Sequence, residues 1–192
     1  MLRMPRSERP SISSGQIEPF AKAFEAAAAA HDALGQAHKV ADYQTVGVRC
    51  REALLSFTAI AQAAIPWNSE AEPPKKSDFK AWIDHICSAT LAGETNKHRR
   101  QLFKTQADAA WTFVNWLTHT TTSNWHDAEA AVSATETVIS LCTNAATLHI
   151  RNVPNQCPQC GDHRLTPLRA QNPDAADEIW ERAFCTACEW MG

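Results

Sequence analysis

The fold is decided by residues 111–119, which read Trp-Thr-Phe-Val-Asn-Trp-Leu-Thr-His. The apolar residues in and just before this stretch repeat at helical spacing and should face a core: Ala110, Phe113, Val114 and Leu117. Asn115 and His119 are four positions apart, so they share one face of the helix, with Asp108 and Thr112 on the same side. A polar stripe that ends in a histidine, on a helix that is otherwise largely apolar, is a candidate functional site.

The same helical spacing recurs along the chain and predicts a mainly α fold. Gly is scarce, with six residues, and Val, Ile and Thr do not cluster in alternating runs as they would in strands. The predicted helices span residues 18–36, 40–65, 77–92, 96–120 and 125–150. Their lengths and short connections predict an up-and-down antiparallel helical bundle. Three cysteines fall on the apolar faces and are expected in its core: Cys50, Cys87 and Cys142.

The chain divides into three parts of different character. Residues 1–17 hold prolines, serines and alternating charges, and we interpret them as a disordered arm. Residues 18–151 form the predicted bundle, and residues 152–192 form a tail with another pattern. The formal charge is +2 on the arm, −2 on the bundle and −3 on the tail. The overall charge of −3 is not typical of a protein that binds nucleic acid through its bulk charge.

The sequence predicts a cytoplasmic protein with no membrane span. No apolar run approaches the roughly 20 residues that a helix needs to cross a bilayer. The first residues include arginines but lack the apolar segment of a signal peptide. Thiols are kept reduced in the cytoplasm, and the odd total of seven cysteines also fits poorly with a disulfide framework.

Four of the cysteines have the spacing of a metal site. Cys157 and Cys160 form one C-x2-C pair, and residues 161–184 separate it from a second pair, Cys185 and Cys188. Two thiolates three positions apart can bind one ion from a tight turn, and Gly161 supplies the positive φ that such a turn often needs. Four sulfurs match tetrahedral zinc with no open position. We therefore expect one structural Zn²⁺ per chain, with iron as the alternative.

The tail resembles the zinc-ribbon family, in which two such turns join a small antiparallel sheet. On that resemblance residues 164–168 and 180–184 are the strands, and residues 173–177 are a loop. Three aromatic residues would pack the ribbon: Trp180, Phe184 and Trp190. Four thiolates and one Zn²⁺ bring the formal charge of the tail to about −5, which is the wrong sign for contact with phosphate. The expected role is to stabilise the chain or to dock a protein partner.

The helical body resembles the HEPN family over roughly residues 38–150. HEPN proteins are small helical bundles that are frequent in prokaryotic toxin–antitoxin and phage-defence systems. Their nucleases carry an arginine, a polar residue, three further residues and a histidine near the end of a helix. Residues 114–119, Val-Asn-Trp-Leu-Thr-His, fit that frame. The resemblance implies that Asn115 and His119 act on RNA without a metal ion, but the arginine position is occupied by Val114.

A cleavage site would therefore need an arginine from elsewhere. We interpret Arg51 as partly buried on a flank of its helix, from which it could reach the site. The alternative is that Arg99 or Arg100 of a partner subunit supplies the cation. The resemblance pairs such sites across a dimer, and the fourth and fifth helices have wide apolar faces, so we expect a homodimer through them. Residues 97–104 carry four cations and a histidine and are a candidate contact for RNA or a nucleotide.

Three functions are consistent with these features. The first is a binding or scaffold module whose ribbon docks a partner, which the apolar Val114 favours; His119 should then hydrogen-bond within the bundle. The second is a metal-independent endoribonuclease, in which His119 should lie in a solvent-reachable cleft beside a cation. The third is a sensor of a small molecule or nucleotide, with the polar stripe as its pocket floor. The sequence contains no Gly-rich phosphate loop, HExxH or nucleophile elbow, which disfavours ATPases, zincins and hydrolases.

Overall fold

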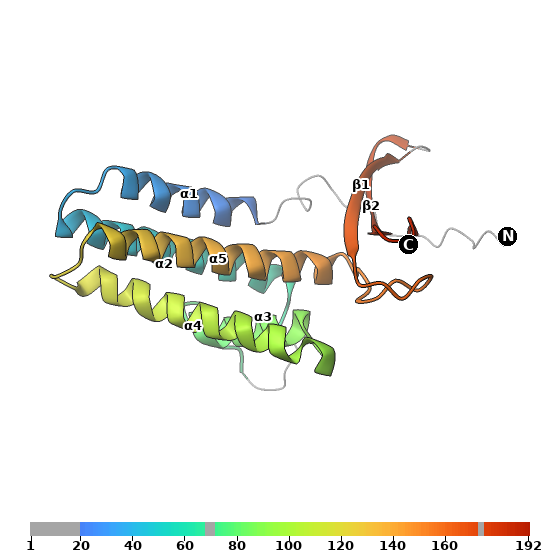
Figure 1. Cartoon of the computed structure of the whole chain (residues 1–192), viewed down its shortest axis with the longest axis horizontal. Helices are drawn as coiled ribbons and strands as arrows, with labels where there is room; N and C mark the ends of the chain where they lie inside the picture. Colours follow the sequence, from blue (N-terminus) through green and yellow to red (C-terminus); the bar gives the residue numbers. More distant parts are fainter. Residues whose placement is uncertain (1–19, 68–71, 173–174) are drawn as a thin grey trace. The chain divides into compact units, whose positions relative to one another are not determined.

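The computed structural model describes residues 20–67, 72–172 and 175–192, with the backbone alone for residues 169–172 and 175–181 (Figure 1). The predicted arm, residues 1–17, lies outside the described residues. The described chain divides into two compact units, residues 20–150 and residues 151–192. Each unit is described by itself.

The first unit is a bundle whose described residues form five α-helices: α1 (Ala21–Gly35), α2 (Val40–Ala64), α3 (Phe79–Thr90), α4 (Lys97–His119) and α5 (Trp125–Ile150). A short 3-10 helix, η2 (Glu94–Asn96), precedes α4. The long helices run side by side, and α3 packs beside α4 (Figure 1). The predicted helical bundle is confirmed, and each helix ends within three residues of its predicted bounds. Among the described helices, none combines the length and the apolar content that a membrane span requires.

The core forms from the helix faces that the sequence predicts. α2 lies at its centre and contacts α1, α3, α4 and α5. Three predicted core residues of α4 are buried: Ala110, Val114 and Leu117. The three cysteines expected in the core are buried as well: Cys50, Cys87 and Cys142. Phe113 is only half-buried, because it lies at the edge of the inner face of α4 and stacks on the exposed Trp116, with ring centroids 5.2 Å apart.

Local signals set the helix ends. Asp42 lies in the first turn of α2, and its carboxylate accepts hydrogen bonds from the backbone N–H groups of His38 and Lys39 at 3.0 and 3.2 Å. Asp78 caps α3 by accepting a hydrogen bond from the Ala81 amide at 3.2 Å. Gly93, with φ of 87°, turns the chain between α3 and η2. These contacts satisfy amides that the helices themselves leave unpaired.

The second unit is built on a hairpin of two antiparallel strands, β1 (Leu165–Asn172) and β2 (Ala175–Cys185). Both strands are longer than predicted, and the loop expected at residues 173–177 is shorter, since β2 begins at Ala175. The prediction was wrong because main-chain pairing continues to Asn172 opposite Ala175, through a stretch with few apolar residues. Phe184 and Trp190 are half-buried in the ribbon, whereas the side chain of Trp180 lies outside the described residues.

Pro167 lies on the edge of β1 that faces away from β2. It is opposite Ala183, whose carbonyl accepts a hydrogen bond from the Gly192 amide, at 2.9 Å, on the far side of β2. Pro167 and Ala183 are therefore a non-hydrogen-bonded pair, and the backbone of Pro167 points outward. A proline at this position removes no ladder hydrogen bond and leaves this one outward position of the edge without a donor.

Candidate metal centre and the polar stripe of α4

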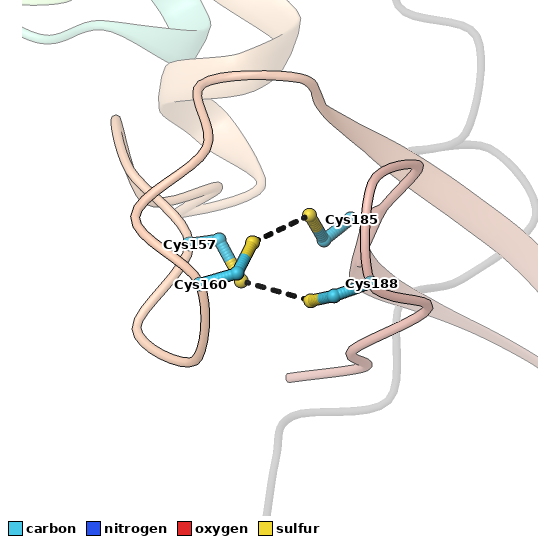
Figure 2. A group of neighbouring side chains, drawn as sticks. All are labelled: Cys157, Cys160, Cys185 and Cys188. Carbon is cyan, nitrogen blue, oxygen red and sulfur yellow. Dashed lines mark hydrogen bonds between the residues drawn. The ribbon is translucent and has the colours of Figure 1, made fainter.

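Four cysteine side chains converge between two turns of the ribbon (Figure 2). The Sγ atoms of Cys157 and Cys188 lie 3.7 Å apart. The Sγ atoms of Cys160 and Cys185 lie 3.7 Å apart as well. All four sulfurs are within 4.8 Å of one another. The prediction that these cysteines form one cluster suited to a metal ion is confirmed.

The two cysteine turns share one hydrogen-bond pattern. In the first turn the Gly161 amide donates to the carbonyl of Cys157 at 2.9 Å, and in the second the Glu189 amide donates to the carbonyl of Cys185 at 2.9 Å. The amide of the first cysteine in each turn donates to the carbonyl five residues later, at 2.8 and 2.9 Å. The fourth position after that cysteine has a positive φ in both turns, 76° at Gly161 and 61° at Glu189.

Glu189 is a site residue that the sequence reasoning missed. A non-glycine residue in the left-handed region costs about 1 kcal/mol, so a glycine was the expected signal. The only sequence signal is positional, since Glu189 stands four residues after Cys185 just as Gly161 stands four residues after Cys157. The turn geometry that brings the two sulfurs together imposes the conformation on whatever residue occupies that position.

The backbone of the first turn favours a thiolate. Desolvation opposes ionisation of Cys157, but hydrogen bonds from the amides of Cys160 and Gln159 and from the Cys188 thiol lower its pKa to about 7. Desolvation, together with the three neighbouring thiols, raises the pKa of Cys188 to about 12. The four sulfurs therefore share protons as a group. A cation bound among them would displace those protons, so binding should weaken as the pH falls.

Asp162 and Arg164 hold the first turn against the start of β1. The Asp162 carboxylate accepts hydrogen bonds from Nε and Nη2 of Arg164 at 3.0 and 2.8 Å. This pairing lowers the pKa of Asp162 from 3.8 to about 2. The stabilisation is therefore complete above pH 3.8 and is lost only as the pH falls toward 2. The Arg164 carbonyl accepts a hydrogen bond from the Thr186 amide at 3.1 Å, which ties the second turn to the first.

The cluster fits a tetrahedral ion with four sulfur ligands. Zn–S bonds of about 2.3 Å place any two sulfurs of a tetrahedron roughly 3.8 Å apart. Two of the sulfur pairs are 3.7 Å apart, and all pairs lie within 4.8 Å. A disulfide would need a separation of about 2.05 Å, and all four cysteines are free. Cys157 and Cys185 are buried and Cys160 is exposed. Because the protein supplies all four ligands, such a site has no position for a substrate.

Most of the polar stripe of α4 is occupied by contacts within the bundle. Lys80 of α3 pairs with Asp108 and lies 3.5 Å from the hydroxyl of Thr112. Asn115 donates from its side-chain amide to the carbonyl of Trp111 in the same helix, at 2.7 Å. Three of the four members of the stripe therefore have structural partners.

A groove of about 180 Å³ between α3 and α4 is lined in part by Asp108, the first residue of the stripe. Its floor is apolar and includes Phe79. Its charged side chains already neutralise one another in two ion pairs, Lys80 with Asp108 and Lys104 with Asp84. A charged small molecule would have to displace one of these pairs, so the groove gives little support to the sensor hypothesis.

His119 is the last residue of α4 and is exposed. It makes no hydrogen bond or ion pair with another residue in the described part of the chain. The hydrogen bond that a scaffold should give His119 is therefore not present among the described residues. Val114, at the position of the expected family arginine, has no exposed surface, at 0%.

Arg51 is not brought to His119. Its side chain is exposed, which corrects the prediction of partial burial, and its guanidinium carbon lies 5.6 Å from the centroid of the Trp111 ring. Trp111 is itself anchored by stacking on Phe79 of α3, with centroids 4.7 Å apart. His119 is eight positions beyond Trp111, about 12 Å along the helix axis. The Arg51 cation, which was expected to complete the site, therefore lies beside Trp111, about two helical turns from His119.

The basic residues 97–104 are engaged in the structure. Arg100 donates to the carbonyls of Leu91 and Gly93, which closes the end of α3. Lys104 pairs with Asp84 of α3. The two remaining cations pair with the preceding turn: Lys97 with Glu94 at 3.0 Å, and Arg99 with Asn96 at 2.7 Å. The two lysines are in ion pairs, whereas Arg99 and Arg100 bond to neutral groups and keep their positive charge, so contact of this stretch with RNA or a nucleotide stays a prediction.

Comparison of the chain with family models, with curated proteins and with solved structures finds no match. The function therefore has to be argued from the residues themselves. The two features that carry such an argument are the four-cysteine cluster and the arrangement around Val114 and His119.

We predict opposite effects of two substitutions at equivalent positions of the turns. Gly161→Val places a β-branched residue at a φ of 76° and should lower the free energy of ribbon unfolding by about 1–2 kcal/mol. Glu189→Gly removes the corresponding strain and should leave the ribbon at least as stable. Hydrogen exchange of the β1 and β2 amides measures both effects. Equal destabilisation by the two variants would contradict this account of the turns.

Proposed function

We propose that this chain is a binding or scaffold module built on a HEPN-like helical bundle, of the kind frequent in prokaryotic defence and toxin–antitoxin systems, with a zinc ribbon that docks a partner. The burial of Val114 carries the proposal, because its exposed surface is 0% at the position of the family arginine. A cation at that position would be buried without a partner, at a cost of several kcal/mol. The helical frame is thus compatible with the family, but its catalytic cation is missing.

We propose zinc as the ion of the cysteine cluster. The donor set is four thiolates, which zinc favours, and the separations of 3.7 Å suit its tetrahedral geometry. With no open position the ion would stabilise the ribbon and would not activate water. A folded ribbon with a formal charge of about −5 favours a protein partner over nucleic acid.

We predict that freshly purified protein holds one zinc ion per chain and that Cys160→Ser lowers this content. Three remaining thiolates bind more weakly, so the ribbon should unfold while the bundle, which has its own core, stays helical. Metal analysis and circular dichroism measure the two results. Cys50→Ala is the control, since Cys50 lies in the bundle core and should not affect the metal. Metal-free wild-type protein would refute the zinc site.

We propose that α4 and α5 form the interface of a homodimer. Trp116 and Leu102 point outward from α4, with 42% and 50% of their surfaces exposed. Residues 109–118 carry no charged side chain, so the outer surface of α4 beside Trp116 lacks the charges that usually keep a helix monomeric. A second copy that covers this surface would remove its apolar side chains from water.

We predict that Trp116→Glu converts a dimer to a monomer, because it places a charge at the centre of the proposed interface. Sedimentation at micromolar concentration measures the mass. The control is Phe24→Glu, which alters a similarly exposed aromatic residue on α1, 44% exposed, and should leave the dimer intact. A monomeric wild-type protein would exclude the interface.

A metal-independent endoribonuclease is a second candidate, and the exposure of His119 favours it. An exposed imidazole with no partner among the described residues is accessible to a substrate as a general acid or base. The site would still need a cation to stabilise charge on phosphorus, and Arg51 is occupied at Trp111. An arginine of a partner subunit would have to supply it, so we rank this function below the scaffold.

We predict that neither the wild-type protein nor His119→Ala cleaves mixed single-stranded RNA. We also expect His119→Ala to change the free energy of unfolding by less than about 0.5 kcal/mol, since the side chain is exposed. His31→Ala, which alters an exposed histidine of α1, is the control. Cleavage that persists in this control, disappears in His119→Ala and survives EDTA treatment that leaves the ribbon folded would establish the nuclease instead.

A further inference from the structure

One face of the ribbon carries a row of apolar side chains, which we call the ribbon face: Leu168, Phe184 and Met191. Leu168 and Met191 are 39% and 52% exposed. Phe184 forms a β-bridge with Met191, and Leu168 is opposite Arg182, two positions from Phe184, so the three apolar residues and Arg182 share one side of the sheet. Cys185 alternates to the other side, toward the metal cluster. The ribbon face is thus separate from the cysteine site.

The charge of the ribbon suits a basic segment. Residues 152–192 carry a formal charge of −3, and four thiolates with one Zn²⁺ would make it about −5. Residues 1–17 of the same chain carry +2. Their three arginines are Arg3, Arg6 and Arg9, and the first of them stands between the apolar residues Leu2 and Met4. This segment has both the charge and the apolar side chains that the ribbon face would bind.

α1 begins and α5 ends at the same end of the bundle. The connections from α1 to α2 and from α4 to α5 lie together, because the Gln44 side chain donates to the carbonyl of Thr120 at 2.7 Å. Phe20, before α1, and Ile150, at the end of α5, therefore both lie at the opposite end of the bundle (Figure 1). Residues 1–19 and residues 151–192 leave from that end. A segment of 19 residues can extend about 60 Å, and tethering gives an effective concentration in the millimolar range.

We infer that residues 1–17 dock on the ribbon face through their apolar side chains, with the arginines facing the acidic ribbon. The inference rests on the proposed zinc ribbon, since an unfolded tail has no such face. Addition of a strand along β1 is disfavoured because Pro167 interrupts the row of donors on its outer edge. Docking therefore uses side chains of the face and not the edge of the sheet. The interaction covers the apolar row and places the arm beside the site at which the ribbon would meet a partner.

The methionines of the chain provide the test, because there are three: Met1 and Met4 in the arm and Met191 on the ribbon face. In protein labelled with ¹³C at the methionine methyl groups, we expect an Overhauser contact between Met4 and Met191. Deletion of residues 2–17 should shift the Met191 methyl signal, and so should the triple variant Arg3→Glu, Arg6→Glu, Arg9→Glu. Salt of about 0.5 M should shift it in the same direction, since screening weakens the attraction. Met191→Leu assigns the signal.

The matched control is the triple variant Arg3→Lys, Arg6→Lys, Arg9→Lys, which keeps the charge and should keep the Met191 signal in place. A Met191 signal that is the same in the full chain and the deletion variant would overturn the docking. A signal that depends on protein concentration but not on the arm would assign the face to a second copy and also overturn it. Metal analysis of the same samples separates the two proposals. One zinc ion per chain with an unchanged Met191 refutes docking alone, whereas absence of metal refutes both.

Discussion

The close approach of α2 and α4 at Gly47 is the constraint on which the bundle depends. A Cβ atom at Gly47 would lie 3.2 Å from Cβ and Cγ of Leu117 and from Cγ2 of Thr118, so a larger residue would push the helices apart. This contact fixes the rotation of α4 about its axis. Val114, three residues before Leu117, must then face the core, and His119, two residues after it, turns outward at the end of the helix. Gly47 is thus one of the contacts that hold α4 in this orientation.

The short helix α3 forms ion pairs with two charged side chains of α4. Its Lys80 and Asp84 reach across to Asp108 and Lys104, and its end is closed by Arg100. These are partly exposed ion pairs, each of which contributes at most about 1 kcal/mol, so their main effect is to position α3 rather than to stabilise it. They also neutralise Lys80 and Lys104, whereas Arg100 bonds to backbone carbonyls and keeps its charge.

The sequence was sufficient for features that depend on period or spacing, and insufficient for those that depend on contacts distant in the chain. Helical periodicity located the helices and most of the core, and the two C-x2-C pairs located the sulfur cluster. The strands were underestimated because residues 169–172 pair through the backbone without an apolar alternation. Lys80 contacts the polar stripe, and Arg51 lies over Trp111. Both contacts join residues of different helices, so no local sequence pattern predicts them. Glu189 was missed because its conformation comes from the turn and not from its own preference.

Pro167 has a consequence for any assembly that concentrates this chain. An exposed strand edge with free amides is a template on which further strands grow, and the risk rises when tethered copies meet repeatedly at high local density. β1 is eight residues long, enough to nucleate such growth, but the outward position at its third residue has no donor. Pro167 therefore interrupts the donor row of this edge, which weakens pairing between β1 and a strand of a second copy.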